Sequence, residues 1–167
     1  MTVRNPRYAL KIAKAIQTSV HGTLPPALDN GLVLYDTLVS NPELRKATRQ
    51  LFADMHYSRS VEEAYKCLNN FVKARSRLVS DDGASLMHKA FSPKNPVLGL
   101  SALRTTSQQD QQQGYMEIFA GCMTGIRNPR AHEHRHLDSP QVATELLALA
   151  NHLFRIVESA RRKRPKP

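Results

Sequence analysis

The chain has no tryptophan, only two cysteines, and aromatic residues at 6% of its 167 positions. Two cysteines are too few for the disulfide-rich scaffold of a small secreted protein. Cys67 and Cys122 each fall on the apolar stripe of a predicted helix. We therefore expect two buried free thiols and neither a disulfide framework nor a cysteine nucleophile.

Long apolar runs are also absent. Every apolar window is interrupted by Lys, Arg or Glu, and none approaches the roughly 20 residues that a membrane-spanning helix needs. The N-terminus carries Arg4, Arg7, Lys11 and Lys14, and it lacks the apolar core of a secretory signal. We expect a cytoplasmic protein with no membrane partner.

Acidic residues are scarce relative to basic ones, with 14 Asp and Glu against 24 Lys and Arg and a formal net charge of +10. Such an excess favours polyanionic partners, because neutralising phosphates releases their condensed counterions. It indicates nucleic acid as the partner, and charge that merely keeps the protein soluble is the alternative. Part of the excess lies in the tail 161–167, which we expect to be a solvated basic arm.

Helix starts are frequent. An Asn or Ser before Pro supplies a capping oxygen, and the missing proline amide costs nothing in the first helical turn. Four such pairs precede segments with helical apolar spacing: Asn5-Pro6, Asn41-Pro42, Asn128-Pro129 and Ser139-Pro140. After the first pair, apolar residues recur every fourth position and predict a helix of about four turns that ends near Gly22.

Apolar spacing predicts further helices in the first half of the chain. The segment 23–39 is ambiguous because Pro25-Pro26 interrupts it, and we favour helix over strand. One helix from Glu43 and a second after a short break have the apolar faces Leu44, Thr48, Leu51, Met55 and Val61, Ala64, Tyr65, Leu68, Phe71, Val72. Asp81-Asp82-Gly83 predicts a turn and a cap before a short helix that ends ahead of Ser92-Pro93.

The second half of the chain is also expected to be helical. A loop over 94–108 and the polar run 108–113 lead into a helix with the apolar face Tyr115, Ile118, Phe119, Cys122, Ile126. Gly121 and Gly125, four residues apart, indicate close packing of another backbone. The last helix has an apolar stripe from Val142 to Val157 that is wide enough to face both a core and a second subunit. With no alternating pattern long enough for a sheet, the predicted fold class is all-α.

The segment 125–134 concentrates the chemistry of the chain. Arg127 is expected to end one helix, and Asn128-Pro129 to begin another that carries His132 about one turn inside it. The free amides of a helix N-terminus favour an anionic ligand. An arginine supplies a planar fork of donors that matches a phosphate, and a histidine can take a proton and return it near neutral pH. These residues therefore predict a phosphate site.

Cleavage of RNA needs little beyond these groups. The 2′-hydroxyl is an internal nucleophile, so a protein need only accept its proton and stabilise the charge on the phosphoryl group. We assign proton transfer to His132, phosphoryl charge to Arg127, and orientation or capping to Asn128. No metal or other cofactor is required, and the products are a 2′,3′-cyclic phosphate and a 5′-hydroxyl.

Several alternatives stay open at this point. An arginine followed five residues later by a histidine also arises by chance, and Asn128 can be only a cap, or Arg127 only an ion-pair partner. The spacing also allows Arg127 with His134, or Arg130 with His136. His132, His134 and His136 alternate, but no cysteine or acidic cluster completes a four-ligand zinc site, so no metal is expected.

The chain resembles the HEPN superfamily and, within it, the Ymh-like family of small bacterial, archaeal and phage proteins. The resemblance runs from about Leu51 to Leu153, with anchors in the same order along the chain. They are Met55-His56-Tyr57, Val61, Asp82-Gly83, Leu86-Met87, Phe91, Gly114-Tyr115, Phe119-Ala120-Gly121, Gly125-Ile126-Arg127-Asn128-Pro129 and Ala131-His132.

The resemblance implies an all-α HEPN-like helical bundle over 41–160. Residues 1–40 match the family poorly and are expected to form an N-terminal helical extension of open role, and 161–167 form the basic tail. The resemblance also implies a homodimer in which both motifs line one RNA-binding cleft, and metal-independent endoribonuclease activity used as a toxin or in phage defence, with an antitoxin or regulatory protein as a possible partner. Arg127, Asn128 and His132 are then catalytic, and the flanking Arg130, His134 and Arg135 bind the substrate.

Two other functions stay open as alternatives. Because some members of the superfamily are not catalytic, the first alternative is an RNA- or protein-binding module that uses the same basic cleft. The second is a DNA-binding regulator, although no helix-turn-helix pair is evident in the sequence.

Overall fold

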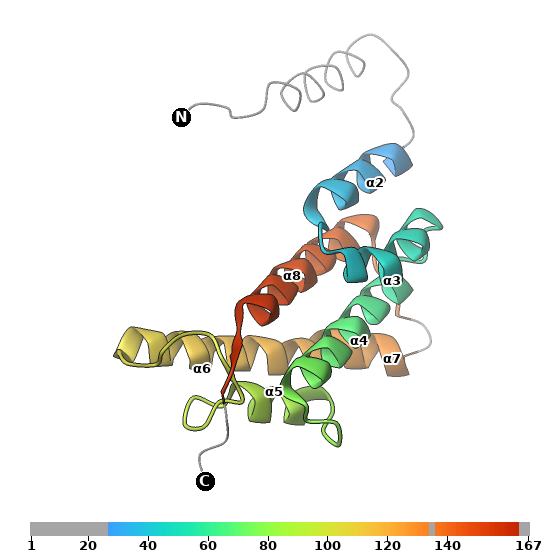
Figure 1. Ribbon diagram of the computed structural model, residues 1–167. Helices are drawn as coiled ribbons and strands as arrows, with labels where there is room; N and C mark the ends of the chain where they lie inside the picture. Colours follow the sequence, from blue (N-terminus) through green and yellow to red (C-terminus); the bar gives the residue numbers. More distant parts are fainter. Residues whose placement is uncertain (1–26, 134–135, 164–167) are drawn as a thin grey trace, which may run out of the picture.

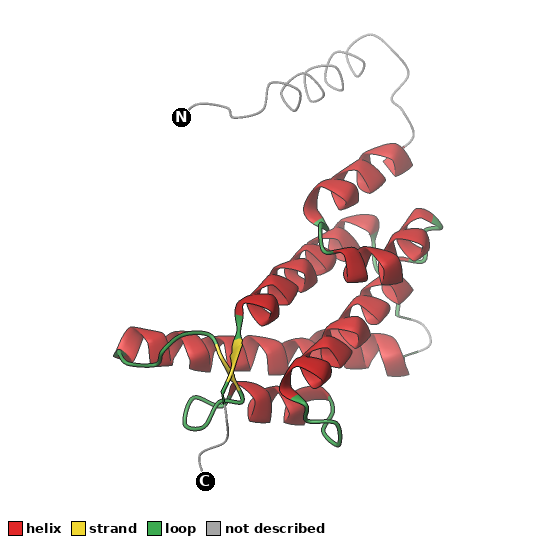
Figure 2. Ribbon diagram, in the orientation of Figure 1, coloured by secondary structure: helices red, strands yellow, loops and turns green. Residues whose placement is uncertain are grey.

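The computed structural model describes residues 27–133 and 136–163. The chain forms α2 (Ala27–Leu38), α3 (Pro42–Ala53), α4 (Tyr57–Ser76), α5 (Gly83–Phe91), β1 (Leu98–Gly99), α6 (Thr106–Gly121), the π-helix η1 (Cys122–Arg127), α7 (Asn128–His132), α8 (Pro140–Ser159) and β2 (Arg161–Arg162). Figure 2 shows that the described part is helical apart from one short strand pair, which confirms the all-α class. The helix expected after Asn5-Pro6 lies outside the described residues.

Two of the predicted helix starts are confirmed by their capping bonds. The Asn41 side chain accepts a hydrogen bond from the amide of Leu44 at 3.0 Å, and the Ser139 hydroxyl accepts one from the amide of Val142 at 3.2 Å. In each helix a proline follows the cap, as the sequence predicts. These caps fix where α3 and α8 begin.

The helix α6 begins earlier than the sequence predicts. Thr105 caps it by accepting from the amide of Gln108, so the polar run 108–113 lies inside the helix. Gln112 is fully buried. Its side chain donates to the carbonyls of Phe91 and Leu98 and accepts from the amide of Leu100. Gln112 is buried because its side chain hydrogen-bonds backbone groups of the preceding segment, and a polar residue of this kind does not add to an apolar helical pattern. The predicted start of the helix was therefore too late.

The core forms around α4 and α8, the two helices of 20 residues. Figure 1 shows both running obliquely to the line of α6 and α7, with α8 above this line and α4 crossing it. The aromatic rings of Phe91 and Phe119 stack at 4.4 Å between α5 and α6, and those of Phe71 and Phe154 at 5.1 Å between α4 and α8. Most predicted core positions are buried, but Met55 is 55% exposed because the chain turns there with φ 63°.

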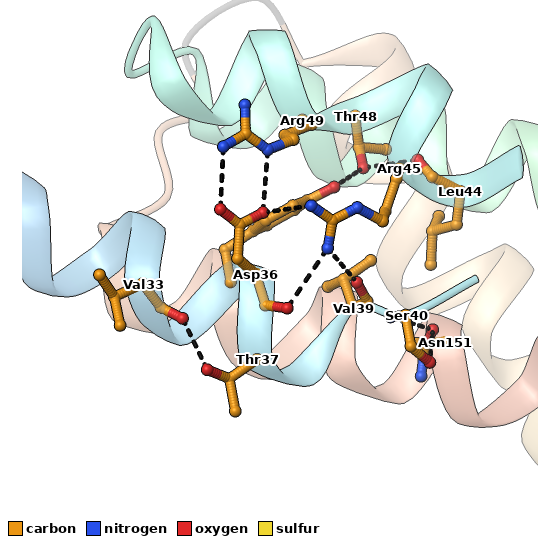
Figure 3. A network of polar contacts seen from close by, with 11 residues as sticks. Val33, Asp36, Thr37, Val39, Ser40, Leu44, Arg45, Thr48, Arg49 and Asn151 are labelled. Atoms are coloured by element: carbon orange, nitrogen blue, oxygen red, sulfur yellow. Dashed lines mark hydrogen bonds and ion pairs between the residues drawn. The ribbon is translucent and has the colours of Figure 1, made fainter. Parts of the chain in front are cut away.

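A polar network fastens α2 to α3 (Figure 3). The carboxylate of Asp36 accepts hydrogen bonds from Arg45 at 2.6 Å and from Arg49 at 2.9 and 2.8 Å. The bonds from Arg49 hold the pKa of Asp36 below its ordinary value. Beside them the buried Tyr35 and Thr48 hydroxyls lie 2.7 Å apart. The helix predicted in 23–39 is thus present from residue 27 and is tied to its neighbour.

The connection between α2 and α3 is tied to α8 as well. The amides of Ser40 and Asn41 both donate to the Asn151 side-chain oxygen, each at 2.9 Å. Tyr35 and Val39 are fully buried in the common core. The end of α2 and the residues that join it to α3 therefore pack against α8 and the common core.

The start of the C-terminal tail is not a free arm. Arg161 and Arg162 form β2, which pairs antiparallel with β1 in the register Leu98 to Arg162 and Gly99 to Arg161. The amide of Lys163 extends the pairing by donating to the carbonyl of Val97 at 2.9 Å. The side chains of Arg161 and Arg162 are exposed, as expected of the solvated arm predicted over 161–167, but the backbone of its first three residues is paired. Two-residue strands are too short to leave an alternating pattern in the sequence.

Candidate functional site

The candidate motif lies near the end of a continuous helical rod formed by α6, η1 and α7 (Figure 1). Arg127 and Asn128 both have α-helical backbone angles, and the amide of Asn128 donates to the carbonyl of Met123. Asn128 therefore continues a helix and does not cap a new one. The predicted helix N-terminus, with free amides for an anion, is not formed.

The π-helix gives a physical reason for this difference. A proline inside an α-helix clashes with the carbonyl four residues before it and lacks the amide that would bond there. In a π-turn the bonds run to the fifth residue back, so the helix is wider. Pro129 is the second residue after η1, and the rod continues through it to His132. The same Asn-Pro signal therefore marks a helix start at residue 41 and a helix interior at residue 128.

The two glycines of the rod do not pack closely within the chain. Gly121 and Gly125 are exposed, and a Cβ added at either position would meet nothing within 4 Å. The predicted close packing is thus wrong within the described part of this chain. Both glycines instead leave an open surface beside the motif.

Arg127 is held in place by contacts that leave much of its guanidinium without a strong acceptor. Its side chain is 23% exposed, and its Nη2 atom lies 3.8 Å from a carboxylate oxygen of Asp82. Nη1 donates to the side-chain oxygen of Asn128 at 3.3 Å. The Nε atom is buried and has no hydrogen-bond partner among the described residues.

The carboxylate near Arg127 is itself shared with other donors. Asp82 accepts hydrogen bonds from Asn69 at 2.7 Å and from Lys73 at 3.1 Å. Burial alone would raise the pKa of Asp82, but these bonds outweigh it and hold the pKa below the ordinary value. Because Lys73 already offsets this charge, Arg127 is positioned by a carboxylate without being neutralised by it.

His132 is the last residue of α7 and is exposed. Its ring makes no hydrogen bond or ion pair with the described residues. At 3.6 residues per turn, five helical steps carry the side chain about 140° around the axis from that of Arg127. Within one chain the two side chains thus leave the rod in different directions.

Arg130 has a different role from the predicted one. Its guanidinium donates to both oxygens of Asp138, at 2.7 and 2.6 Å, and to the carbonyl of Ile126 at 2.8 Å. The side chains of Arg130 and Asp138 are only 6% and 4% exposed. This buried pair leaves Arg130 no accessible donor for a substrate, so the predicted substrate-binding role does not fit Arg130.

The Arg130–Asp138 pair also fixes the segment that follows α7. The amide of Asp138 donates to the Ser58 hydroxyl at 2.7 Å, which joins this segment to the start of α4. His136 lies 3.4 Å from Asp138 through its Nε2 atom. The alternative pair, Arg130 with His136, is thus brought together, but both side chains contact the structural carboxylate of Asp138. His134 and Arg135 lie outside the described residues.

One family model matches the chain over residues 39–157, and its description is "Protein of unknown function (Hypoth_ymh)". The chain belongs to this Ymh family. Comparisons with curated proteins and with solved structures find no match. The Ymh match begins just after α2 and covers α3 through most of α8, so it includes Arg127, Asn128 and His132.

Within the Ymh match, the contacts of the motif could not be found from sequence. Asp82 was predicted as part of a turn and as an anchor of the resemblance, and no sequence pattern singles out Asn69 or Lys73. Asp82 reaches Arg127 from a part of the chain far away in sequence, and Asn69 and Lys73 bind Asp82 in turn. Co-variation of these positions in an alignment of Ymh relatives would be the signal for such contacts.

Other reactive groups of this Ymh chain show no sign of a second site. Burial raises the pKa of both thiols, Cys67 and Cys122, the latter to about 11, and both are free. In residues 27–133 and 136–163, no three His, Cys, Asp or Glu side chains come together as metal ligands. No helix in the same ranges is both long and apolar enough to cross a membrane.

Proposed function

We propose that this protein is a metal-independent endoribonuclease of the HEPN type. The observation that carries the proposal is the contrast between two arginines of one motif. Arg130 is only 6% exposed and bound to a carboxylate, whereas Arg127 is 23% exposed and has one long carboxylate contact at 3.8 Å. A phosphate is the ligand that such a guanidinium fits. The imidazole of His132, five residues on, is exposed and so is accessible to a ligand.

The proposed reaction is an internal transfer of the phosphoryl group. His132 accepts the proton of the 2′-hydroxyl as the O2′ atom attacks phosphorus, and Arg127 stabilises the charge on the non-bridging oxygens. The P–O5′ bond breaks, and the O5′ leaving group takes up a proton, which leaves a 2′,3′-cyclic phosphate and a 5′-hydroxyl. Asn128 orients Arg127 through its 3.3 Å hydrogen bond. DNA, which lacks the 2′-hydroxyl, is not cleaved.

The different directions of Arg127 and His132 favour a site shared between two copies of the chain. In a symmetric homodimer, Arg127 of one copy and His132 of the other can converge on one phosphate, and symmetry produces two such sites. Gly121 and Gly125 lie open beside the motif, where an added methyl group would meet no atom of this chain. A second helix therefore has access to the rod there.

The cellular role that we propose is that of a growth-arresting toxin or a phage-defence effector, acting on RNA in the cytoplasm. An antitoxin or regulatory protein would then restrain it. This part of the proposal is supported by the resemblance to HEPN proteins alone. Expression of the protein, and of its His132→Ala variant, in a bacterial host tests it: arrest by the first but not the second is expected, and equal growth of both contradicts it.

The experiment that tests the activity uses purified protein, RNA and EDTA. We expect cleavage by the wild type, and losses of about 10²–10⁴-fold for His132→Ala and about 10²–10³-fold for Arg127→Ala. His88→Ala and Arg155→Ala, exposed positions on α5 and α8, are the matched controls and should cleave normally. Equal cleavage by all five proteins would remove the motif from the mechanism.

A non-catalytic RNA- or protein-binding module is the second candidate. It is favoured by the continuous helix through Asn128, which removes the helix N-terminus as an anion site. Under this function, His132→Ala leaves the biological effect intact, while substitutions that reverse surface charge abolish it. Binding without cleavage by the wild type would support this candidate.

A further inference from the structure

Four cations gather where the C-terminal strand meets the loop before α6. A hollow of about 680 Å³ is lined by residues 99–102, Ser159, Arg161, Arg162 and Lys163. A second hollow of about 330 Å³, lined by residues 93–96, Leu103 and Gln109, shares Lys163 with the first. We call the two together the basic groove. Every charged residue that lines it is positive: Lys94, Arg161, Arg162 and Lys163.

These cations have no carboxylate partners. Arg45, Arg59, Lys66, Lys73 and Lys89 all pair with Asp or Glu side chains. Over residues 27–133 and 136–163, no ion pair involves any of the four cations of the basic groove. Unpaired cations facing a hollow without acids produce a positive potential that attracts a polyanion.

The backbone fixes the cations in the groove. Pairing of β2 with β1 sets the positions of Arg161 and Arg162, and the amide of Lys163 is bound to Val97. The stem of Lys163 lies across Gly99, where an added Cβ would come within 2.5 Å of the lysine Cε atom. A larger residue at position 99 would displace this flexible stem from where it lies. Positions set in advance lower the entropic cost of binding.

The remaining lining favours phosphates over bases or lipid. Ser101, Asn95 and Gln109 supply neutral hydrogen-bond donors, and no aromatic ring lines either hollow. Single-strand binders that hold bases stack them on aromatic rings. The large apolar side chains that are exposed in the described part of the chain, such as Val33, Leu137 and Val142, lie elsewhere.

We infer that the basic groove binds the phosphate backbone of RNA without preference for sequence. This inference rests on the proposed function for the identity of the polyanion. The groove lies on elements other than α7, which carries His132, and so holds RNA apart from the cleaved bond.

Binding is measured apart from cleavage with 2′-O-methyl oligouridine, which has no free 2′-hydroxyl. The test variant is Arg161→Gln with Arg162→Gln, which leaves the strand backbone unchanged. Since each phosphate contact adds about 0.7 to the salt slope, loss of two contacts should weaken binding about 25-fold at about 0.1 M salt and lower the slope by about 1.4. The charge-matched control, Lys46→Gln with Arg155→Gln on α3 and α8, should bind as the wild type does.

The outcomes separate the inference from the proposed function. Groove-dependent binding with no RNA cleavage supports the inference and defeats the nuclease. Cleavage with equal binding by both double variants defeats the inference and leaves the nuclease intact. Equal weakening in test and control variants shows general electrostatic attraction and overturns the inference. Binding to vesicles rich in phosphatidylserine, with none to the oligonucleotide, also overturns it, in favour of a membrane surface.

Discussion

At the scale of single residues, the motif contains two arginines that chemistry alone cannot distinguish. Arg127 and Arg130 are three positions apart on one rod, and both were predicted to meet a phosphate. The fold places Arg130 against Asp138, where both side chains are almost fully buried, and Arg127 against the shared carboxylate of Asp82. One arginine is therefore structural, and the other is available to a ligand.

Stability should separate the two arginines. Arg130→Ala leaves the Asp138 carboxylate buried without its partner, so we expect the free energy of unfolding to fall by about 3–5 kcal/mol. Arg127→Ala removes a long ion pair and one hydrogen bond to Asn128, and should cost about 1–2 kcal/mol. Urea denaturation of both variants measures this, and equal losses would contradict the assigned roles.

Asp138 should also make stability depend on pH. Burial raises its pKa, but hydrogen bonds from Arg130 outweigh burial and hold the pKa below the ordinary value. A depressed folded-state pKa stabilises the protein above the unfolded value of about 3.9, and this contribution is lost as pH falls through the folded value. The difference in unfolding free energy between wild type and Asp138→Asn should therefore shrink on acidification from pH 6 to 3. A constant difference would contradict the linkage.

At the scale of elements, local signals predicted the helices whose ends are set locally. Asn41 and Ser139 cap α3 and α8 as expected, because the cap bonds lie within one turn. Asn128-Pro129 has the same signal but continues a helix, because the preceding π-turn accommodates the proline. The start of α6 was missed because Gln112 is buried by contacts with a distant loop. Sequence spacing does not contain these longer-range causes.

The open face of the rod should tolerate a methyl group. Gly121 ends α6 with empty space around its missing side chain, so Gly121→Ala should raise the free energy of unfolding by about 1 kcal/mol. Gly83, with φ +56°, is the control, because alanine in this left-handed conformation costs about 1–2 kcal/mol. Thermal unfolding of dilute, monomeric protein gives both values. Destabilisation by Gly121→Ala would show an unseen contact.

At the scale of the whole molecule, periodicity predicted the all-α class and most of the core. The location of the charge could not be predicted, because the +10 excess becomes a groove only where β2 pairs with β1. Nor could the sequence show that Arg127 and His132 leave the rod in different directions, since this follows from the uninterrupted helix between them.

Mixing inactive variants tests whether the site is shared. If Arg127 of one copy works with His132 of the other, each mixed dimer of Arg127→Ala and His132→Ala has one intact site of two. Random exchange makes half of the dimers mixed, so about a quarter of the wild-type RNA cleavage should return. Cleavage assays after co-refolding measure this. No recovery, from variants shown to form mixed dimers, would contradict a shared site.

The central claim is that the motif turns the 2′-hydroxyl of RNA into the nucleophile. A DNA strand with one embedded ribonucleotide, incubated with the protein in EDTA, tests this most directly. We predict one cut, directly after the ribonucleotide, with a 2′,3′-cyclic phosphate on one product and a 5′-hydroxyl on the other, and no cut by His132→Ala. Cleavage elsewhere in the DNA, products with a 5′-phosphate, or an intact strand beside the wild-type protein would contradict it.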